Sequence, residues 1–150
     1  MLNTDRTTEL IIETFRLNGE LLAAGDRLVG DFGLTSARWQ VLGAIDLSPV
    51  PLPVAHLARN MGLSRQAVQR VANELASAGL VRFADNPHHA RAKLVEMTAA
   101  GKRAYAQAMA RQKPWAAALG RKLSARDTET AIRVLRTMRR ELETRMEVDP

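Results

Sequence analysis

The clearest pattern of apolar and polar positions lies in residues 57–83. It predicts a short helix, a tight turn, a second helix over about 64–78 and the first strand of a hairpin. The apolar stripe of the second helix repeats at steps of three and four residues, and its members are Val68, Val71, Leu75 and Ala78. One face of this helix can therefore pack inward.

The opposite face of the second helix is polar and carries no acid. Its members are Arg65, Gln66, Gln69, Arg70 and Asn73. These side chains are the types that bind phosphates and read base edges. Ser64 precedes them as an N-cap, so the positive end of the helix favours a phosphate at the same place. The pattern indicates a helix that binds nucleic acid.

On both sides of this helix the chain favours extended structure. The proline-rich connector 48–53 cannot be helical throughout, and it leaves room for a strand of one or two residues at Leu52. After residue 80 the period changes to alternation, which predicts two strands, 81–84 and 93–97, joined by a loop. Arg91 and Lys93 then lie at or just beyond the tip of a two-stranded wing.

The two ends of the chain predict helices with broad apolar faces. The first helix spans about 5–28, and its apolar residues cover more than one face. A helix capped by Thr98 meets Pro114, which should kink or end it near Lys113. The S-x-x-D pattern from Ser124 to Asp127 opens the last helix as a capping box. We expect 1–34 and 99–150 to form a helical dimerisation region that is intertwined with a DNA-binding region, 35–98.

Composition and charge agree with a mainly helical protein. The chain has 150 residues, 4% aromatic residues and no cysteine, which excludes disulfides and thiolate metal sites. The net charge of +6 is unevenly spread, at −3 for residues 1–52, +4 for 53–93 and +5 for 94–150. The basic excess therefore begins where the helix-turn-helix pattern begins, as nucleic-acid binding requires.

Other functional classes find little support in the sequence. Apolar runs are too short for a membrane span and the N-terminus does not resemble a signal peptide, so we expect a cytoplasmic protein without a membrane partner. His88 and His89 lack further ligands at suitable spacing, so no metal site is expected. No phosphate loop, no G-x-S-x-G and no paired carboxylates occur, so we expect no catalytic residues, no cofactor and no enzyme.

With these elements in order, the chain resembles the MarR family of winged helix-turn-helix transcriptional regulators. The resemblance is carried by LARNMGLSRQAVQRVANELASAGLVRFADNPHHARAKLVEMTAAG, with TSARWQVLGAI before it and LSARDTETAIRVLRTM after it. It implies a mainly α fold with a two-stranded β wing, flanked by N- and C-terminal dimerisation helices. It also implies a homodimer that binds double-stranded DNA at a pseudo-palindromic operator, as a repressor released by a small-molecule effector.

The resemblance also assigns roles to residues. It gives DNA contacts to Ser64, Arg65, Gln66, Gln69 and Arg70, and makes Arg91 the arginine of the wing tip. Family members often have Asp-Arg-Arg there, whereas this chain has His89-Ala90-Arg91. We hypothesise that His88 or His89, when charged, contacts phosphate. An effector pocket between the terminal helices and the DNA-binding region would be lined by Phe15, Arg16, Trp39, Met109 and Trp115.

Two alternatives remain open from the residues alone. A helical interaction or scaffold protein would use the basic face to bind an acidic partner protein. A nonspecific architectural DNA binder would use it for phosphates only and would not distinguish between sequences.

Overall fold

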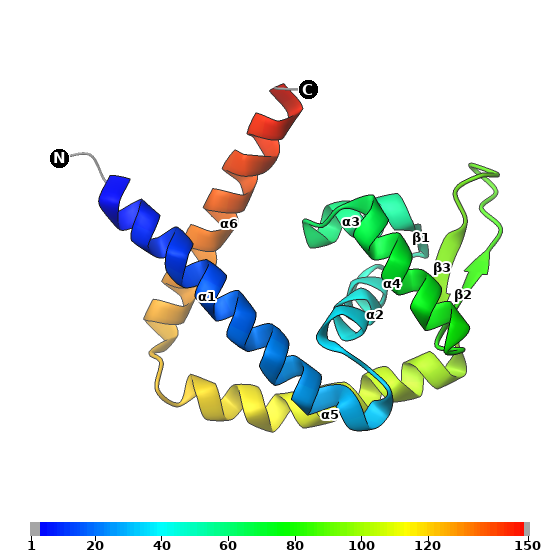
Figure 1. Ribbon diagram of the computed structural model, residues 1–150, viewed down its shortest axis with the longest axis horizontal. Helices are drawn as coiled ribbons and strands as arrows, with labels where there is room; N and C mark the ends of the chain where they lie inside the picture. Colours follow the sequence, from blue (N-terminus) through cyan, green and yellow to red (C-terminus); the bar gives the residue numbers. More distant parts are fainter. Residues whose placement is uncertain (1–3, 149–150) are drawn as a thin grey trace. The chain divides into compact units, whose positions relative to one another are not determined.

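The computed structural model describes residues 4–148, which form a mainly helical chain with one small sheet. By its internal contacts the chain divides into two compact units, residues 1–112 and 113–150. The elements are α1 (Thr4–Val29), a 3-10 helix (Gly30–Phe32), α2 (Ser36–Leu47), β1 (Leu52–Pro53), α3 (Val54–Met61), α4 (Arg65–Ser77), β2 (Val81–Ala84), β3 (Leu94–Met97), α5 (Ala99–Gly120) and α6 (Ala125–Val148) (Figure 1).

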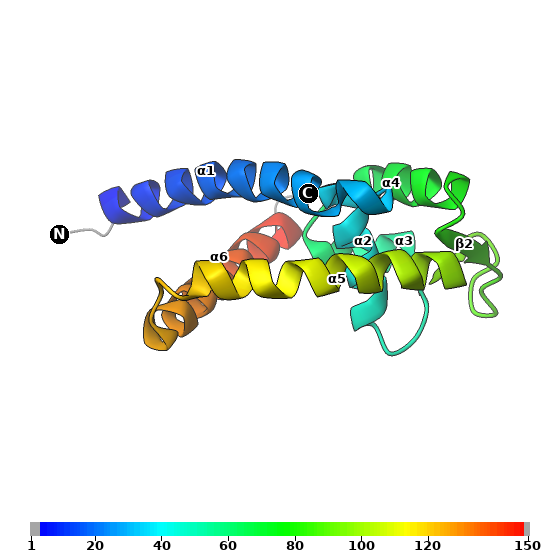
Figure 2. The ribbon, with the colours of Figure 1, turned by 90° about the horizontal axis from the view of Figure 1, so that it is seen from below.

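The core of the first unit is built around α2. This helix lies between α4 on one side and the first half of α5 on the other (Figure 2). Its Leu42 is fully buried, together with side chains from α1, α3, α4 and β3. The largest of these are Val29, Leu57, Leu75, Val68 and Val95. The packed side chains fix α4 from behind and leave its other face outward.

The buried stripe of α4 is confirmed with one correction. Val68, Val71 and Leu75 are buried as predicted, but Ala78 is exposed and Ala72 is buried instead. The reason is that α4 ends at Ser77, so Ala78 is the C-cap and no longer follows the helical stripe. Gly79 follows with φ 74°, a left-handed conformation that glycine adopts without strain.

The sheet contains three antiparallel strands in the order β1-β3-β2, one more than a two-stranded wing. The strand predicted at Leu52 exists, and Leu52 pairs with Val95 of β3. On the other edge of β3, Phe83 pairs with the same residue. The short β1 therefore ties the proline-rich connector and α3 to the base of the wing.

A tight polar crossing joins α1 to α2. Ser36 is buried, its backbone N–H donates to Asp26 Oδ1 at 2.7 Å, and its hydroxyl donates to the Leu22 carbonyl at 2.7 Å. A side chain at Gly25 would overlap the Ser36 hydroxyl. This close approach sets the direction in which α1 leaves the core.

The course of α5 decides between the two outcomes expected at Pro114 only in part, because it excludes the end of the helix there and does not test a kink. The helix does not end near Lys113 but continues through Pro114 to Gly120. A proline removes only one N–H from the helical ladder, and hydrogen bonds on both sides of it can keep the helix continuous. Ser124 is confirmed as the residue that caps α6, since its hydroxyl accepts the Asp127 N–H at 3.0 Å and donates to the Asp127 carboxylate at 2.7 Å.

Both terminal helices expose apolar side chains. In α1 these include Phe15, which is 73% exposed, and Leu17. In α6 no described side chain is buried, and Leu142 is 61% exposed beside the less exposed Ile132 and Leu135. The apolar faces of α1 and α6 are therefore surfaces that a single chain leaves open.

From Thr4 to Val148, no helix is both long and apolar enough to cross a membrane.

Candidate nucleic-acid interface

The outward face of α4 carries the residues predicted to bind DNA. Ser64 caps the helix, because its hydroxyl accepts the Ala67 N–H at 3.1 Å. Behind the polar face lies the buried stripe, so the polar side chains can only point outward. Those predicted from the sequence are all exposed, namely Ser64, Arg65, Gln66, Gln69, Arg70 and Asn73.

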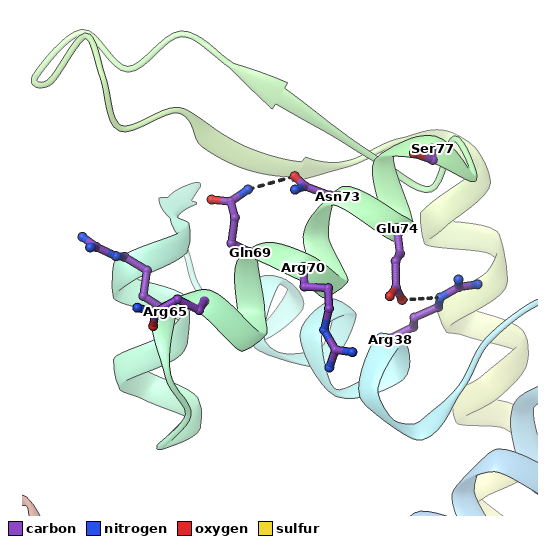
Figure 3. Close-up of a pocket in the computed structure, with 8 residues that line it drawn as sticks. Arg38, Arg65, Gln69, Arg70, Asn73, Glu74 and Ser77 are labelled. Atoms are coloured by element: carbon purple, nitrogen blue, oxygen red, sulfur yellow. Dashed lines mark hydrogen bonds and ion pairs between the residues drawn. The ribbon is translucent and has the colours of Figure 1, made fainter.

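A broad cleft of about 760 Å³ runs along this face of α4. It is lined by all of these predicted residues except Ser64, and also by Arg38, Glu74 and Ser77 (Figure 3). Arg38 comes from α2, and its Nε lies 3.3 Å from a carboxylate oxygen of Glu74. The sequence pattern did not reveal Arg38, because its place beside α4 depends on the packing of two helices.

A second cleft, of about 550 Å³, lies between α4 and the wing. It brings Arg65, Gln69 and Asn73 together with Arg91 and Lys93, residues predicted for two different elements. The Gln69 amide donates to Asn73 Oδ1 at 2.9 Å, which fixes the orientation of both amides. Phe83 of β2, which was not predicted as a site residue, forms part of the wall.

The wing loop is organised by Asn86, another residue that the sequence prediction missed. Its side chain donates to the Ala92 carbonyl at 2.9 Å and accepts the His88 N–H at 3.0 Å. The second of these bonds closes a turn of the kind that an Asn before Pro commonly forms. The Asn-Pro pair was therefore the signal in the sequence for this turn. His88 and His89 are exposed in this loop, and neither lines the two clefts beside α4.

The acids near the interface are paired with cations. Glu74 faces Arg38, and Asp85 at the base of the wing loop is bonded to Lys93. Within residues 4–148, Arg65, Arg70 and Arg91 have no ion-pair partner. Three guanidinium groups on one surface are thus available to an anionic ligand such as a phosphate backbone.

We expect Lys93→Met to raise the pKa of the Asp85 carboxyl towards its ordinary value. The hydrogen bond from Lys93, together with its positive charge, lowers this pKa in the folded chain. A lowered pKa means that the pair stabilises the loop above the ordinary carboxyl range and that this contribution fades as pH falls through the lowered value. A ¹³C NMR titration of the Asp85 carboxyl measures the shift. Arg91→Met is the matched control, and an equal shift there would contradict the assignment to Lys93.

The residues predicted for an effector pocket are spread along the chain. Phe15 is largely exposed, Arg16 bonds Glu13 at 2.7 Å, and Trp39 packs against the core. Met109 is partly exposed on α5, and Trp115 belongs to the second unit. None of them lines the two clefts beside α4. Their joint role remains a prediction.

Tyr105 of α5 lies on the other side of α2. Burial raises the pKa of the Tyr105 phenol, and the Asp46 carboxylate adds to the effect. A Cβ on Gly43 would lie 3.6 Å from the phenol oxygen, so Tyr105 packs against α2. Among residues 4–148, no three His, Asp or Glu side chains are grouped as a metal ion would require.

Comparison with known proteins identifies the fold and the family. A model of the MarR family matches residues 32–92. An uncharacterized protein of Mycobacterium tuberculosis H37Rv is 37% identical over 100 residues, which cover 67% of this chain and 68% of that protein. The chain belongs to the MarR family. The family resemblance seen in the sequence is confirmed.

Solved structures extend the likeness to almost the whole chain. The transcriptional regulator MosR of M. tuberculosis, solved in complex with DNA, has a TM-score of 0.77 and 26% identity and covers 89% of this chain and 96% of its own. CouR of Rhodococcus jostii RHA1, solved with bound p-coumaroyl-CoA, has a TM-score of 0.75 and 21% identity and covers 87% and 91%. The likeness to these structures confirms the predicted fold class. MarR family regulators are DNA-binding transcription factors and not enzymes, which agrees with the prediction of a non-enzymatic protein.

Proposed function

We propose that this MarR family chain is a homodimeric, sequence-specific DNA-binding repressor that a small-molecule ligand releases from its operator. The observation that carries the proposal is the surface shared by α4 and the wing. There, exposed amides and three unpaired guanidinium groups face outward from a helix whose other side is buried. A regulator of transcription acts beside the chromosome, so the proposal includes the cytoplasmic location expected from the sequence.

Each subunit would place α4 in the major groove of one half-site. Gln66, Gln69 and Arg70 contact base edges, while Ser64 and Arg65 bind phosphates at the positive end of the helix. The hydrogen bond from Gln69 to Asn73 orients the Gln69 amide for such a contact. In the wing, Arg91, Lys93 and His89 contact the backbone. Two half-sites about one helical turn, roughly 34 Å, apart form the pseudo-palindrome.

Dimerisation would use the terminal regions 1–34 and 99–150, leaving 35–98 as the DNA-binding region. The exposed apolar side chains of α1 and α6 support this division, since a single chain leaves them in water. A symmetric dimer is the commonest way for a chain of this size to cover such faces. It also places two copies of α4 on one DNA duplex.

The effector would bind near Phe15, Arg16, Trp39, Met109 and Trp115. The bound p-coumaroyl-CoA in the CouR structure supports a ligand site in a protein of this fold. A ligand releases DNA only if it binds more tightly to a dimer in which the spacing of the two α4 helices no longer fits the operator. Release by an effector therefore requires two dimer states.

We expect Arg70→Ala to weaken binding to the DNA beside the protein's own gene far more than binding to random duplex. A bidentate contact to a base is worth about 1 to 3 kcal/mol of discrimination, and a dimer makes the contact twice. Fluorescence anisotropy with both duplexes at several salt concentrations measures the two losses. Arg121→Ala in the second unit is a control that removes the same charge from a residue that lines neither cleft beside α4.

Three results would contradict this proposal. Equal losses on both duplexes would give Arg70 a phosphate contact instead of a base contact. Wild-type binding that does not distinguish the two duplexes would favour a nonspecific architectural protein. No salt-sensitive binding to either duplex, with or without added ligands, would favour the scaffold alternative.

A further inference from the structure

Arg38 reaches the interface from outside the helix-turn-helix. It lies in the first turn of α2, 36 positions before Glu74 in the chain, yet it lines the cleft along α4. Its Nε donates to the Glu74 carboxylate at 3.3 Å and its NH1 group donates to the Gly33 carbonyl at 3.3 Å. Figure 3 shows Arg38 and Glu74 turned towards each other beside Arg70.

The chemistry of the guanidinium suits a third partner. Arginine carries five N–H donors in one plane, and the two bonds of Arg38 leave further donors open to the cleft. The side chain is 28% exposed, so it is neither a core residue nor a freely moving surface residue. A guanidinium that is already held in place loses little conformational freedom when it binds a phosphate.

The position of Arg38 also matches the shape of DNA. A helix in the major groove, which is about 12 Å wide, has one sugar-phosphate strand on each side. On the wing side of α4, Arg65 and Arg91 share the second cleft. On the α2 side, Arg38 is the cation that α2 contributes to the cleft along α4. One strand of the groove would thus pass the wing, and the other would pass α2.

We propose that Arg38 binds a phosphate of the strand on the α2 side of α4, and that Glu74 is a positioning residue which holds the guanidinium there. The proposal rests on the proposed function, because it requires α4 to enter the major groove. It adds an α2 contact to those of the recognition helix and the wing. It also explains why an acid lies on the rim of this surface, where its charge alone would repel DNA. The Glu74 carboxylate is there to hold Arg38 in place.

A purely structural pair makes a different prediction. If Arg38 and Glu74 only tie α2 to α4, the pair contributes no net charge, and removing both side chains leaves the affinity for DNA unchanged. If Arg38 binds phosphate, removing both side chains loses one contact per subunit. The double variant R38A/E74A therefore separates the two interpretations, which R38A alone cannot do because it leaves Glu74 unpaired beside the DNA.

The test measures binding to a random-sequence duplex by fluorescence anisotropy between about 50 and 200 mM salt. We expect R38A/E74A to bind about tenfold more weakly than wild type, with a slope of log K against log[salt] that is smaller by about 0.9 per subunit. R38K should keep the slope and lose part of the affinity, since it keeps the charge but not the planar donors. E74A should bind no more tightly than wild type.

The matched control is R82A/E96A. This second Arg–Glu pair joins β2 to β3 at 2.8 Å, and Arg82 alternates with Phe83, which faces the cleft beside α4. Arg82 therefore points away from α4, and the control should leave affinity and slope unchanged. Equal melting temperatures show that none of the variants loses its fold.

Four outcomes would overturn the inference. Wild-type affinity and slope in R38A/E74A would reduce the pair to a tie between two helices. Tighter binding by E74A would show that Glu74 competes with phosphate and does not position Arg38. An equal loss in R82A/E96A would reveal a general effect of removing ion pairs. A wild-type protein without salt-sensitive binding would overturn the proposed function together with this inference.

Discussion

Replacing Gly101 with alanine is expected to lower the free energy of unfolding by about 3 kcal/mol, the upper end of the range for an overpacked core site. A Cβ at this position would overlap the carbonyl oxygen of Leu80 and lie 2.9 Å from its carbonyl carbon. Neither atom can yield cheaply, because both belong to the backbone. The Leu80 carbonyl also accepts the Thr98 N–H at 3.0 Å, so moving it would break that bond.

The effect of this substitution reaches α4, whose outward face is the surface proposed to bind DNA. Thr98 donates its hydroxyl to the Gly79 carbonyl at 2.6 Å and accepts the Gly101 N–H at 3.1 Å. These bonds fasten the start of α5 to the end of α4. Gly101→Ala therefore weakens the connection through which α5 supports α4.

Urea unfolding at one fixed protein concentration measures the change. Gly120→Ala is the control, because a Cβ at Gly120 meets no atom within 4 Å and should change stability by no more than about 1 kcal/mol. A Gly101→Ala protein as stable as Gly120→Ala would show that α4 and α5 are not held together at this point.

Much of the first unit could be predicted because the decisive information is local. The cap at Ser64, the buried stripe of Val68, Val71 and Leu75, and the polar face opposite them all follow from residues within a few positions of one another. The change from helical spacing to alternation after Leu80 located β2 in the same way. Short-range pattern was enough to define α4 and the two strands of the wing, but not the pairing of β1 with β3.

The features that the sequence did not reveal depend on packing between distant segments. Arg38 meets Glu74 only because α2 crosses behind α4, and Gly25 meets Ser36 only because α1 crosses α2. Neither Arg38 nor Gly25 is an unusual residue type at its place in the chain, so the sequence did not mark either of them. In the same way, the sequence alone does not reveal that Gly101 is required, because the reason is the Leu80 carbonyl that lies against it in the fold.

Pro114 did not end the helix, which was one of the two outcomes expected from the sequence. Its effect on a helix is usually decisive, but the turns on either side of it continue α5 to Gly120. One lost hydrogen bond competes with many retained ones. The division of the chain into two units nevertheless falls between Gln112 and Lys113, beside this proline.

The double variant L135E/L142E is expected to abolish the dimer and weaken binding to operator DNA by about 100-fold or more. Both leucines lie on the exposed apolar face of α6, two turns apart, and they are 42% and 61% exposed. Buried in a dimer interface, each glutamate would have to lose its hydration without a partner. A monomer binds one half-site and loses the gain that comes from linking two binding events.

Sedimentation velocity should show twice the chain mass of 16.5 kDa for wild type and the chain mass itself for the variant. The matched control is T137E/T144E, which introduces the same charges at the same spacing on another face of α6. The hydroxyls of Thr137 and Thr144 bond to carbonyls one turn back, so these side chains lie along their own exposed helix surface. The control should stay dimeric and bind DNA.

A dimeric L135E/L142E protein would exclude this face of α6 from the interface and leave the exposed apolar side chains of α1 and α5 as the remaining surfaces. A monomeric variant that kept its affinity for DNA would contradict the pairing of two half-sites. The leucine result therefore separates the role of α6 in assembly from the role of α4 in binding, because no residue of α4 is changed.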